Sequence, residues 1–460
     1  MTKYLNSKFL WLALGVGIIT CSLYILFVSD NLTFDADPDS SRIILFAIQK
    51  ILIGLLFFLA VINIKKLPIT EQWIAFIIFT GLLARMILLP SVPALENDYY
   101  RYLWDGAVTA NGVNPYSISP QQVMDKDTVV PERIIHLAEE SGEVIHKINH
   151  PKIRTLYPAL SQAVFSISYI FFPWSVSGFK IIMLLADLLL LFFIIGILKE
   201  LKLPKTFIAI YWLNPIVIHQ FFSAVHYDLF AVLFTAISFY YFLKSKYISA
   251  GIILAIAVGF KLYPVLILPF YLRKITDQKI KFALTTIVFA VIVFVIFIPV
   301  LLAGFDENQG LIKYAANWIN NAAFYTLLKD SIDWFTTTFK IYYVCADCVA
   351  RWITVAIMLL TIIGLNIKQA KSNKEIANKI VIAFAVMFLI SPTQFPWYFT
   401  WLVVPLTFSP KFSLLMYSFL LPLYHLNYLG DYFIYIQHIP VFLLFLYEIT
   451  NKRRMEVIFE

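Results

Sequence analysis

The sequence predicts an all-α protein that crosses a membrane many times, as a helical bundle of about 12–14 spans or half-spans. Of its 460 residues, 60% are hydrophobic and 17% are aromatic, while only 14% are charged. A soluble domain is roughly half apolar and a quarter charged. Long apolar runs also alternate with short clusters of lysine and arginine. We therefore expect one integral membrane domain over residues 1–460.

Each apolar run is a candidate span or half-span, because about 20 apolar residues cross a bilayer as a helix. The first run, FLWLALGVGIITCSLYILFV, lacks a small-residue cleavage site, which favours a retained span over a signal peptide. The runs lie at 9–28, 43–64, 73–92, 178–198, 206–222, 228–243, 247–260, 264–272, 282–302, 349–366, 379–391, 397–409, 411–428 and 432–450.

Basic clusters predict the orientation of these spans, because short cytoplasmic loops are rich in lysine and arginine. The net charge of +8 falls mostly in such clusters between apolar runs. We interpret it as a topology signal and expect no nucleic-acid partner. Both termini are then cytoplasmic. The clusters are KK (65–66), KELKLPK (199–205), KSK (244–246), RKITDQKIK (273–281), KQAKSNKEIANK (368–379) and NKRR (451–454).

Two segments must be shorter than full spans for this orientation to hold. A span at 157–173 would put KELKLPK outside, so we predict an interfacial or re-entrant helix there, on the outer side. The apolar stretch after residue 247 must turn back near Lys261. Pro264 supplies the break, since it lacks the amide hydrogen of a continuing helix.

This threading places the polar motifs on the outer face. A large external loop spans 94–177 and carries ENDYYRYLWDG, and a second spans 304–347. HYD (226–228), KLYP (261–264), SPTQFPWY (391–398) and NYLGDY (427–432) fall on the same side. The orientation comes from the basic clusters alone, so the shared location of these motifs is an independent result. A single outward-facing site is the simplest interpretation.

The acidic motif can present a mixed stripe at the membrane surface. If it is helical, Asp98, Arg101, Tyr102 and Asp105 share one face. A structural alternative is an exposed Asp98–Arg101 ion pair worth under about 1 kcal/mol, with Asp105 capping the helix end. The turn GVNPY, which contains Asn114, follows at the interface. This context favours a functional role.

Lys261 lies between apolar runs, where a lysine is costly unless it faces a cavity or an anion. A phosphate would suit it, and snorkelling to the interface is the alternative. His226 and Asp228 follow a break between two runs. They could orient an acceptor or bind a metal, and capping of the next helix by Asp228 is the alternative.

Three further features have mainly structural interpretations. Asp187 lies inside the hydrocarbon region and must pair with a partner or face a polar cavity. Pro215 breaks a span and leaves Asn214 to satisfy freed backbone groups. The cysteines of CADC (345–348) favour a local disulfide or plain packing over a redox site.

The chain has no Walker loop, no dinucleotide-type glycine fingerprint after a strand and no large cytoplasmic domain. A nucleotide sugar or ATP is therefore a poor candidate substrate. An outward site needs an activated substrate that is already in the membrane. A lipid-linked phosphate or diphosphate meets that need.

Several motifs resemble the multi-spanning glycosyltransferases of the C superfamily (GT-C), which use polyprenyl-phosphate sugars. They are ENDYYRYLWDGAVTANGVNPY, LYPAL, GFKIIMLLADLL, WLNPIVIHQFFSAVHYDLFAVLF, FKLYPVLILP and SPTQFPWYFTWLVVP, in family order over roughly residues 75–410. Within this superfamily, the motifs resemble those of the bacterial mannosyltransferases that use polyprenyl-phosphate mannose as the donor. They resemble those of GPI mannosyltransferase I more distantly.

The resemblance implies a GT-C bundle with interfacial helices in the external loop, preceded by two extra spans over residues 1–70. The family places two acids in the first large external loop. Asp98 matches the second acid, and its companion here is Glu96 or Asn97. Some relatives use a divalent metal, so Mg or Mn is a possible cofactor, with no ligand set assigned. The resemblance also implies a bacterial inner membrane with the site facing the periplasm.

These observations predict an inverting transfer of a hexose, mannose first, from a polyprenyl-phosphate donor to a glycan or lipid acceptor. Asp98, assisted by Glu96, is the predicted general base, and Lys261 with Arg101 binds the phosphate. The predicted substrate contacts are Tyr102, Trp104, Asp105, Asn114, His226, Asp228, Tyr263, Trp397 and Tyr398. The aromatic residues among them could equally be interfacial belt residues.

Two other functions remain open from the sequence. A lipid-linked sugar flippase or small-solute transporter would use the same cavity without making a bond. It would favour charges along the depth of the bundle, where Asp187 is the clear example. A structural subunit of an envelope-polymer assembly would leave Asp98 and Lys261 replaceable.

Overall fold

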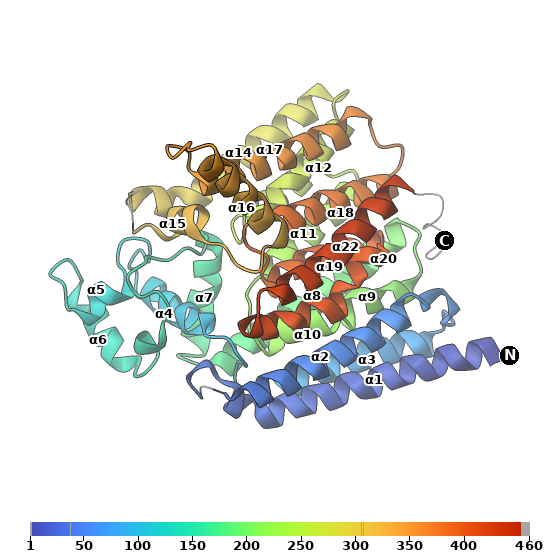
Figure 1. Ribbon diagram of the computed structural model, residues 1–460, viewed down its shortest axis with the longest axis horizontal. Coiled ribbons are helices and arrows are strands. Elements are labelled where there is room, and N and C mark those ends of the chain that lie inside the picture. Colours follow the sequence, from blue (N-terminus) through green and yellow to red (C-terminus); the bar gives the residue numbers. More distant parts are fainter. Residues whose placement is uncertain (1, 37, 305, 307, 452–460) are drawn as a thin grey trace.

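The computed structural model describes residues 2–36, 38–304, 306 and 308–451, and in these residues the secondary structure is helical (Figure 1). The described chain contains no strand, only one isolated bridge between Asn320 and Thr393. The predicted all-α class is therefore confirmed.

Seven helices in the described part are long and apolar enough to cross a membrane, which makes this a multi-pass membrane protein. They are α1 (Thr2–Val28), α2 (Ser40–Val61), α3 (Glu71–Leu88), α8 (Val176–Glu200), α14 (Lys279–Leu302), α17 (Ala346–Ile367) and α22 (Tyr432–Thr450). The predicted runs between them fold as shorter helices. The total of about 12–14 spans stays a prediction.

The shorter helices complete the bundle. Those of the core are α9 (Ile208–Trp212), α10 (Pro215–Phe222), α11 (Leu229–Leu243), α12 (Tyr247–Val258), α13 (Leu268–Lys274), α18 (Asn373–Ile390), α19 (Thr400–Phe408), α20 (Phe412–Leu415) and α21 (Tyr417–Leu420). Those outside it are α4 (Asp98–Ala110), α5 (Pro120–Met124), α6 (Glu132–Glu140), α7 (Ala159–Phe171), α15 (Gly310–Asn317) and α16 (Ala323–Thr338). Single 3₁₀ turns join several of them.

Two predicted helix breaks are present, each for a local reason. Asn214 caps α10 by accepting the amide of Ile216, and its amide group donates to the carbonyl of Ile210. The groups freed at Pro215 are thus partly satisfied, as predicted. Helix α12 ends at Val258, and a 3₁₀ turn begins at Tyr263. Lys261 lies in this break.

The beginning of α1 and the end of α22 lie at one end of the bundle, and α4, α5, α6 and α7 lie at the other (Figure 1). Helix α7, in the segment predicted to be interfacial, packs against α4. Gly106 allows this approach, because a Cβ there would lie 2.4 Å from the carbonyl oxygen of Phe165. The segment between α3 and α8, which we call the external segment after its predicted location, has a small hydrophobic core of its own around Trp104 and Ile134.

A buried ion pair joins α3 to α8. Arg85 pairs through its Nε with Asp187, and both side chains are 0% exposed. Tyr211 donates to the other carboxylate oxygen of Asp187. The guanidinium also donates to the carbonyl of Trp212 at 2.8 Å and lies 3.7 Å from the centre of its ring. Asp187 therefore has the interhelical partner that its position required.

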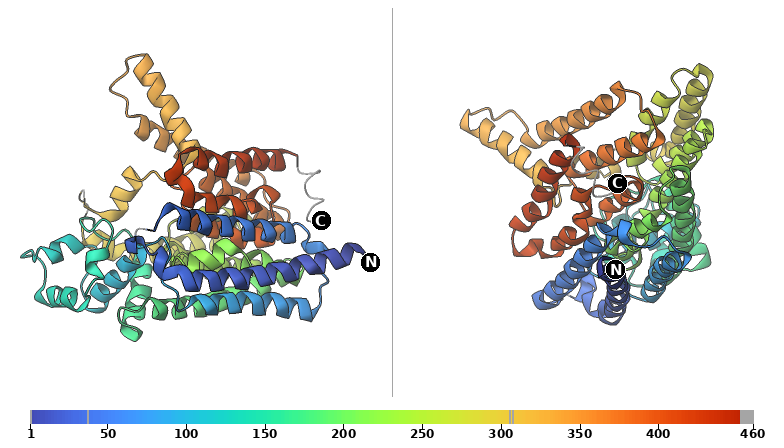
Figure 2. Two further views of the ribbon diagram at one scale, coloured as in Figure 1. Left: turned by 60° about the horizontal axis from the view of Figure 1, so that its bottom comes forward. Right: turned by 90° about the vertical axis from the view of Figure 1, so that its right-hand side faces the viewer.

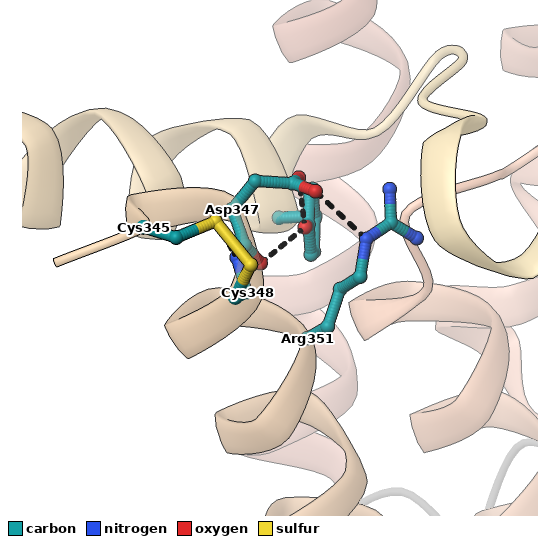
Figure 3. Close-up of a disulfide and its surroundings, with 5 residues drawn as sticks. Cys345, Asp347, Cys348 and Arg351 are labelled. Carbon is teal, nitrogen blue, oxygen red and sulfur yellow. Dashed lines mark hydrogen bonds and ion pairs between the residues drawn. A yellow bond between two sulfur atoms is a disulfide. The ribbon is translucent and has the colours of Figure 1, made fainter.

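The segment around α16 stands away from the bundle (Figure 2). A disulfide between Cys345 and Cys348 lies at the start of α17 (Figure 3). Asp347, inside this disulfide loop, accepts the hydroxyl of Tyr325 from α16 and pairs with Arg351 at 2.9 Å. The CADC motif therefore ties α16 to α17, in agreement with its structural interpretation.

Candidate active site

The acidic motif forms the start of α4. Leu95, just before it, has a backbone φ of 53°, which turns the chain sharply into the helix. Glu96 then accepts the backbone amides of Asn97 at 3.0 Å and Asp98 at 3.1 Å. Free amides at a helix start favour a carboxylate, so this local geometry holds Glu96 and Asp98 side by side.

The surroundings of Asp98 make its carboxyl a weaker acid than an ordinary aspartate. Its Oδ1 accepts the amide of Asn149 at 2.9 Å. Burial and the neighbouring Glu96 charge raise the pKa of Asp98 to about 6, against the opposing effects of His226, Asn149 and Lys261. A carboxyl with a pKa near 6 is ionised at neutral pH and is more basic than an ordinary aspartate.

Glu96 has the opposite character. Its Oε2 lies 3.2 Å from Nε2 of His226. Burial would raise the pKa of Glu96, but the His226 charge and hydrogen bond and two backbone amides together lower it. The imidazole stacks on Trp397 with ring centres 3.9 Å apart. Two adjacent carboxylates with separated pKa values suit different roles.

Lys261 is held in an aromatic cage. Its Nζ lies 4.7 Å from the ring centre of Tyr227 and 5.2 Å from that of Tyr398. The ammonium also lies 3.5 Å from Oδ1 of Asp228, which accepts the indole N–H of Trp401 at 2.6 Å. With 13% of its side chain exposed, Lys261 is a positioned cation that still reaches a cavity.

Two cavities meet at Lys261. The first, which we call the polar cavity, has a volume of about 400 Å³ and is lined by Glu96, Asp98, Arg101 and Lys261 among others. The second, the apolar cavity, has a volume of about 420 Å³ and is lined mostly by leucine, methionine and aromatic side chains. Both volumes suit small-molecule sites. The residues lining both cavities are Leu156, Lys261, Tyr314 and Tyr398.

The shared wall is braced by contacts of α15 with Tyr398 and with the start of α17. The hydroxyls of Tyr314 in α15 and Tyr398 share a hydrogen bond. Arg351 pairs with Asp347 in the disulfide loop (Figure 3). It also donates to the carbonyl of Ala315 at 2.7 Å. Ala315 is the neighbour of Tyr314 and itself lines the apolar cavity. The disulfide loop and the cavity wall are therefore mechanically connected.

The structure brings together part of the predicted site. The predicted residues that line the polar cavity are Glu96, Asp98, Arg101, Tyr102, Lys261, Trp397 and Tyr398. His226 and Asp228 lie behind its wall, where they contact Glu96 and Lys261. Asp228 is the residue before α11 but makes no side-chain capping bond there. Tyr263 lines the apolar cavity instead.

Three predicted contact residues lie elsewhere. Trp104 packs in the hydrophobic core of the external segment and is 2% exposed. Asp105 pairs with Arg101 at 2.7 Å and is buried. The amide of Asn114 donates to the carbonyl of Pro299. Trp104 and Asp105 are close to Glu96 and Asp98 in sequence, which is why they were predicted to contact substrate. In the folded protein, Trp104 faces the hydrophobic core of the external segment and Asp105 faces α7.

Sequence reasoning missed residues that come from the far end of the external loop and from α15. Asn149, Arg154, Tyr157 and Tyr314 all line the polar cavity. The run KINHPKIR (147–154) was a usable signal, since it carries two lysines, an asparagine, a histidine and an arginine just before the apolar run at 157–173. No local pattern marks Tyr314, because its role depends on the packing of a distant helix.

The donor set does not fit the divalent metal that some GT-C relatives use. In the part of the chain that the structure describes, no group of three or more His, Cys, Asp or Glu side chains could hold a metal ion. Glu96 is engaged by His226, and Asp98 by Asn149. We therefore derive no step through Mg or Mn.

Part of the site lies in a region of the chain that matches a protein-family model. Residues 85–276 match the model of the MptA_B family, described as alpha-(1->6)-mannopyranosyltransferase, N-terminal domain. No curated protein and no solved structure matches the chain. Over residues 85–276, which carry Glu96, Asp98, His226 and Lys261, the chain therefore matches the mannosyltransferase family that its motifs predicted.

Proposed function

We propose that this protein is an inverting glycosyltransferase that moves mannose from a polyprenyl-phosphate donor to a glycan or lipid acceptor. The observation that carries this proposal is the junction of the two cavities at Lys261. The polar cavity offers room for sugar chemistry beside Asp98. The apolar cavity offers a place for a lipid chain. A lipid-phosphate sugar would fit with its sugar in the polar cavity, its phosphate at Lys261 and its lipid chain in the apolar cavity.

In the proposed reaction, Asp98 acts as the general base. The acceptor hydroxyl oxygen attacks the anomeric carbon while Asp98 takes its proton. The bond from that carbon to the phosphate oxygen breaks, and its electron pair leaves with the lipid phosphate. Attack from the side opposite the phosphate inverts the configuration, as in the base half of an inverting glycosidase. A phosphate needs no protonation to leave.

Lys261 stabilises the charge that grows on the departing phosphate. The surrounding rings of Tyr227 and Tyr398 limit its hydration, which strengthens its electrostatic effect. Asp228 keeps the lysine in place, and Trp401 keeps Asp228 in place. Arg101, paired with Asp105, contributes a second positive charge to the same cavity.

We further propose that the site faces the outer side of the membrane, the periplasm in a bacterium. The basic clusters support this orientation, because they fall on the ends of the spans opposite the acidic motif. The external loops at 94–177 and 304–347 follow from the same threading, while the two extra N-terminal spans (1–70) are implied by the family resemblance.

Reconstitution tests the proposed function directly. The purified protein is placed in proteoliposomes with polyprenyl-phosphate [¹⁴C]mannose and α-1,6-mannobiose in the external medium. We expect labelled trisaccharide with an α linkage formed from a β-linked donor. Transfer with retained configuration would contradict the mechanism. Movement of intact lipid-linked sugar without transfer would instead favour the flippase or transporter.

A further inference from the structure

The polar cavity has an end that it shares with the apolar cavity and a remaining part that it does not share. The shared end is marked by Lys261, Tyr314 and Tyr398. The lining also includes Phe34 and Tyr424, which do not line the apolar cavity. If a lipid donor occupies the shared end, then a second substrate has to enter through the remaining part.

Phe34 reaches this remaining part from outside the matched family region. It lies in a 3₁₀ turn (Phe34–Ala36) between the first two candidate spans. The turn is fastened to the acidic motif, because the amide of Leu95 donates to the carbonyl of Leu32 at 2.6 Å. The amide of Val92 likewise donates to the hydroxyl of Ser29 at 3.2 Å. The two extra spans thus place the ring of Phe34 in the same cavity as Glu96 and Asp98.

The exposure of Phe34 calls for a partner. Its side chain is 61% exposed. Many other exposed apolar residues, such as Phe27 at 77%, lie on candidate membrane spans, where lipid is the expected surrounding. Phe34 lies outside the candidate spans and borders a cavity that contains two carboxylates. Aromatic faces bind the apolar side of a hexose, while carboxylates accept its hydroxyls.

Tyr424 stands near the same acids. It lies in the 3₁₀ segment Leu421–Leu429, and its ring is 6.5 Å from that of Phe395 in an edge-to-face contact. Burial, and then the charges of Glu96 and Asp98, raise the pKa of Tyr424. Its hydroxyl therefore stays protonated and can donate to a sugar oxygen.

We propose that Phe34 and Tyr424 form an acceptor subsite, in which a sugar ring of a glycan stacks on Phe34 and turns one hydroxyl toward Asp98. This inference rests on the proposed function, because it assigns the lipid donor to the Lys261 end. It adds that the extra N-terminal spans select the acceptor. Donor binding is then independent of Phe34.

Two substitutions separate this role from membrane anchoring. Phe34→Leu keeps an apolar side chain but removes the ring, and Phe34→Tyr keeps the ring. Phe27→Leu is the matched control on α1. Each variant is assayed in proteoliposomes with polyprenyl-phosphate mannose and α-1,6-mannobiose, and the KM of each substrate is measured. We expect Phe34→Leu to raise the acceptor KM about threefold to tenfold, the value of one aromatic stacking contact.

We expect the donor KM to stay at the wild-type value in Phe34→Leu, and Phe34→Tyr to restore the acceptor KM. An unchanged acceptor KM in Phe34→Leu would overturn the inference. So would an equal rise in Phe27→Leu, which would indicate a general effect of apolar contacts with the bilayer. Failure of the proposed function would be visible separately, as absence of transfer by the wild-type protein, and it would overturn this inference as well.

Discussion

Two sets of opposite charges in this protein differ in what they face. Arg85 and Asp187 pair directly between α3 and α8, with both side chains 0% exposed. Asp98 and Lys261 line one cavity, and each has a different partner, Asn149 and Asp228. Burial of a charge therefore does not mark a site in this protein. A site is indicated where buried charges are held by separate partners and face a common space.

The largest effect on transfer is expected from Asp98→Asn. The amide is nearly isosteric with the carboxylate but cannot take the acceptor proton. We expect kcat to fall about 10²- to 10⁴-fold, measured as initial transfer in proteoliposomes. The melting temperature serves as the folding control. Activity within threefold of the wild type would remove Asp98 from the mechanism.

Lys261→Gln is expected to have the next largest effect. Loss of one preorganised charge at a departing group costs about 10²- to 10³-fold in rate. Lys180→Gln is the matched control, since Lys180 is a buried lysine that donates to the carbonyls of Leu88 and Ser91. Transfer per folded molecule should be unchanged in that control. Equal losses in both variants would point to folding instead of phosphate binding.

The pH dependence should follow Asp98. Its raised pKa of about 6 means that the basic form is lost below that pH. We expect kcat/KM to fall about tenfold for each pH unit below 6 and to level off above it. Lys261 lowers the pKa of Asp98, so Lys261→Gln should move the midpoint upward. A profile flat between pH 4.5 and 7 would contradict the assignment.

Asp187→Asn should have the smallest effect on transfer and a clear effect on stability. Removal of one partner leaves Arg85 buried without its counter-charge, which costs roughly 3–5 kcal/mol. We expect a lower melting temperature in detergent but an unchanged kcat per folded molecule. A transport function would predict the reverse, because it would use the charge in the depth of the bundle. This variant therefore also tests the alternative function.

Helix positions were largely predictable because the bilayer imposes a strong and local rule. Apolar runs of the right length fold as helices, and Pro264 and Pro215 mark breaks near or at their positions. The acids after the third span and Lys261 were singled out from local sequence, as candidates. Charges inside or beside apolar runs are costly, so each one requires an explanation.

Within α4, the residues that line the polar cavity differ most from the predicted set. A helical stripe correctly joined Asp98, Arg101 and Tyr102, but it could not show which side of α4 would face the cavity. Trp104 turned out to belong to a small core of the external segment. Asn149 and Tyr314 were missed because their positions depend on a loop and a helix that pack from far along the chain.

The sequence by itself determined that this is an all-α membrane protein with an acidic motif and a lysine between apolar runs, because composition and apolar run length act locally. Only the tertiary structure decided that Asp98 and Lys261 line one cavity, that Asp187 does not share it, and that Phe34 borders it. Cavities form between helices that are distant in sequence. Their linings depend on how those helices pack, which no local pattern records.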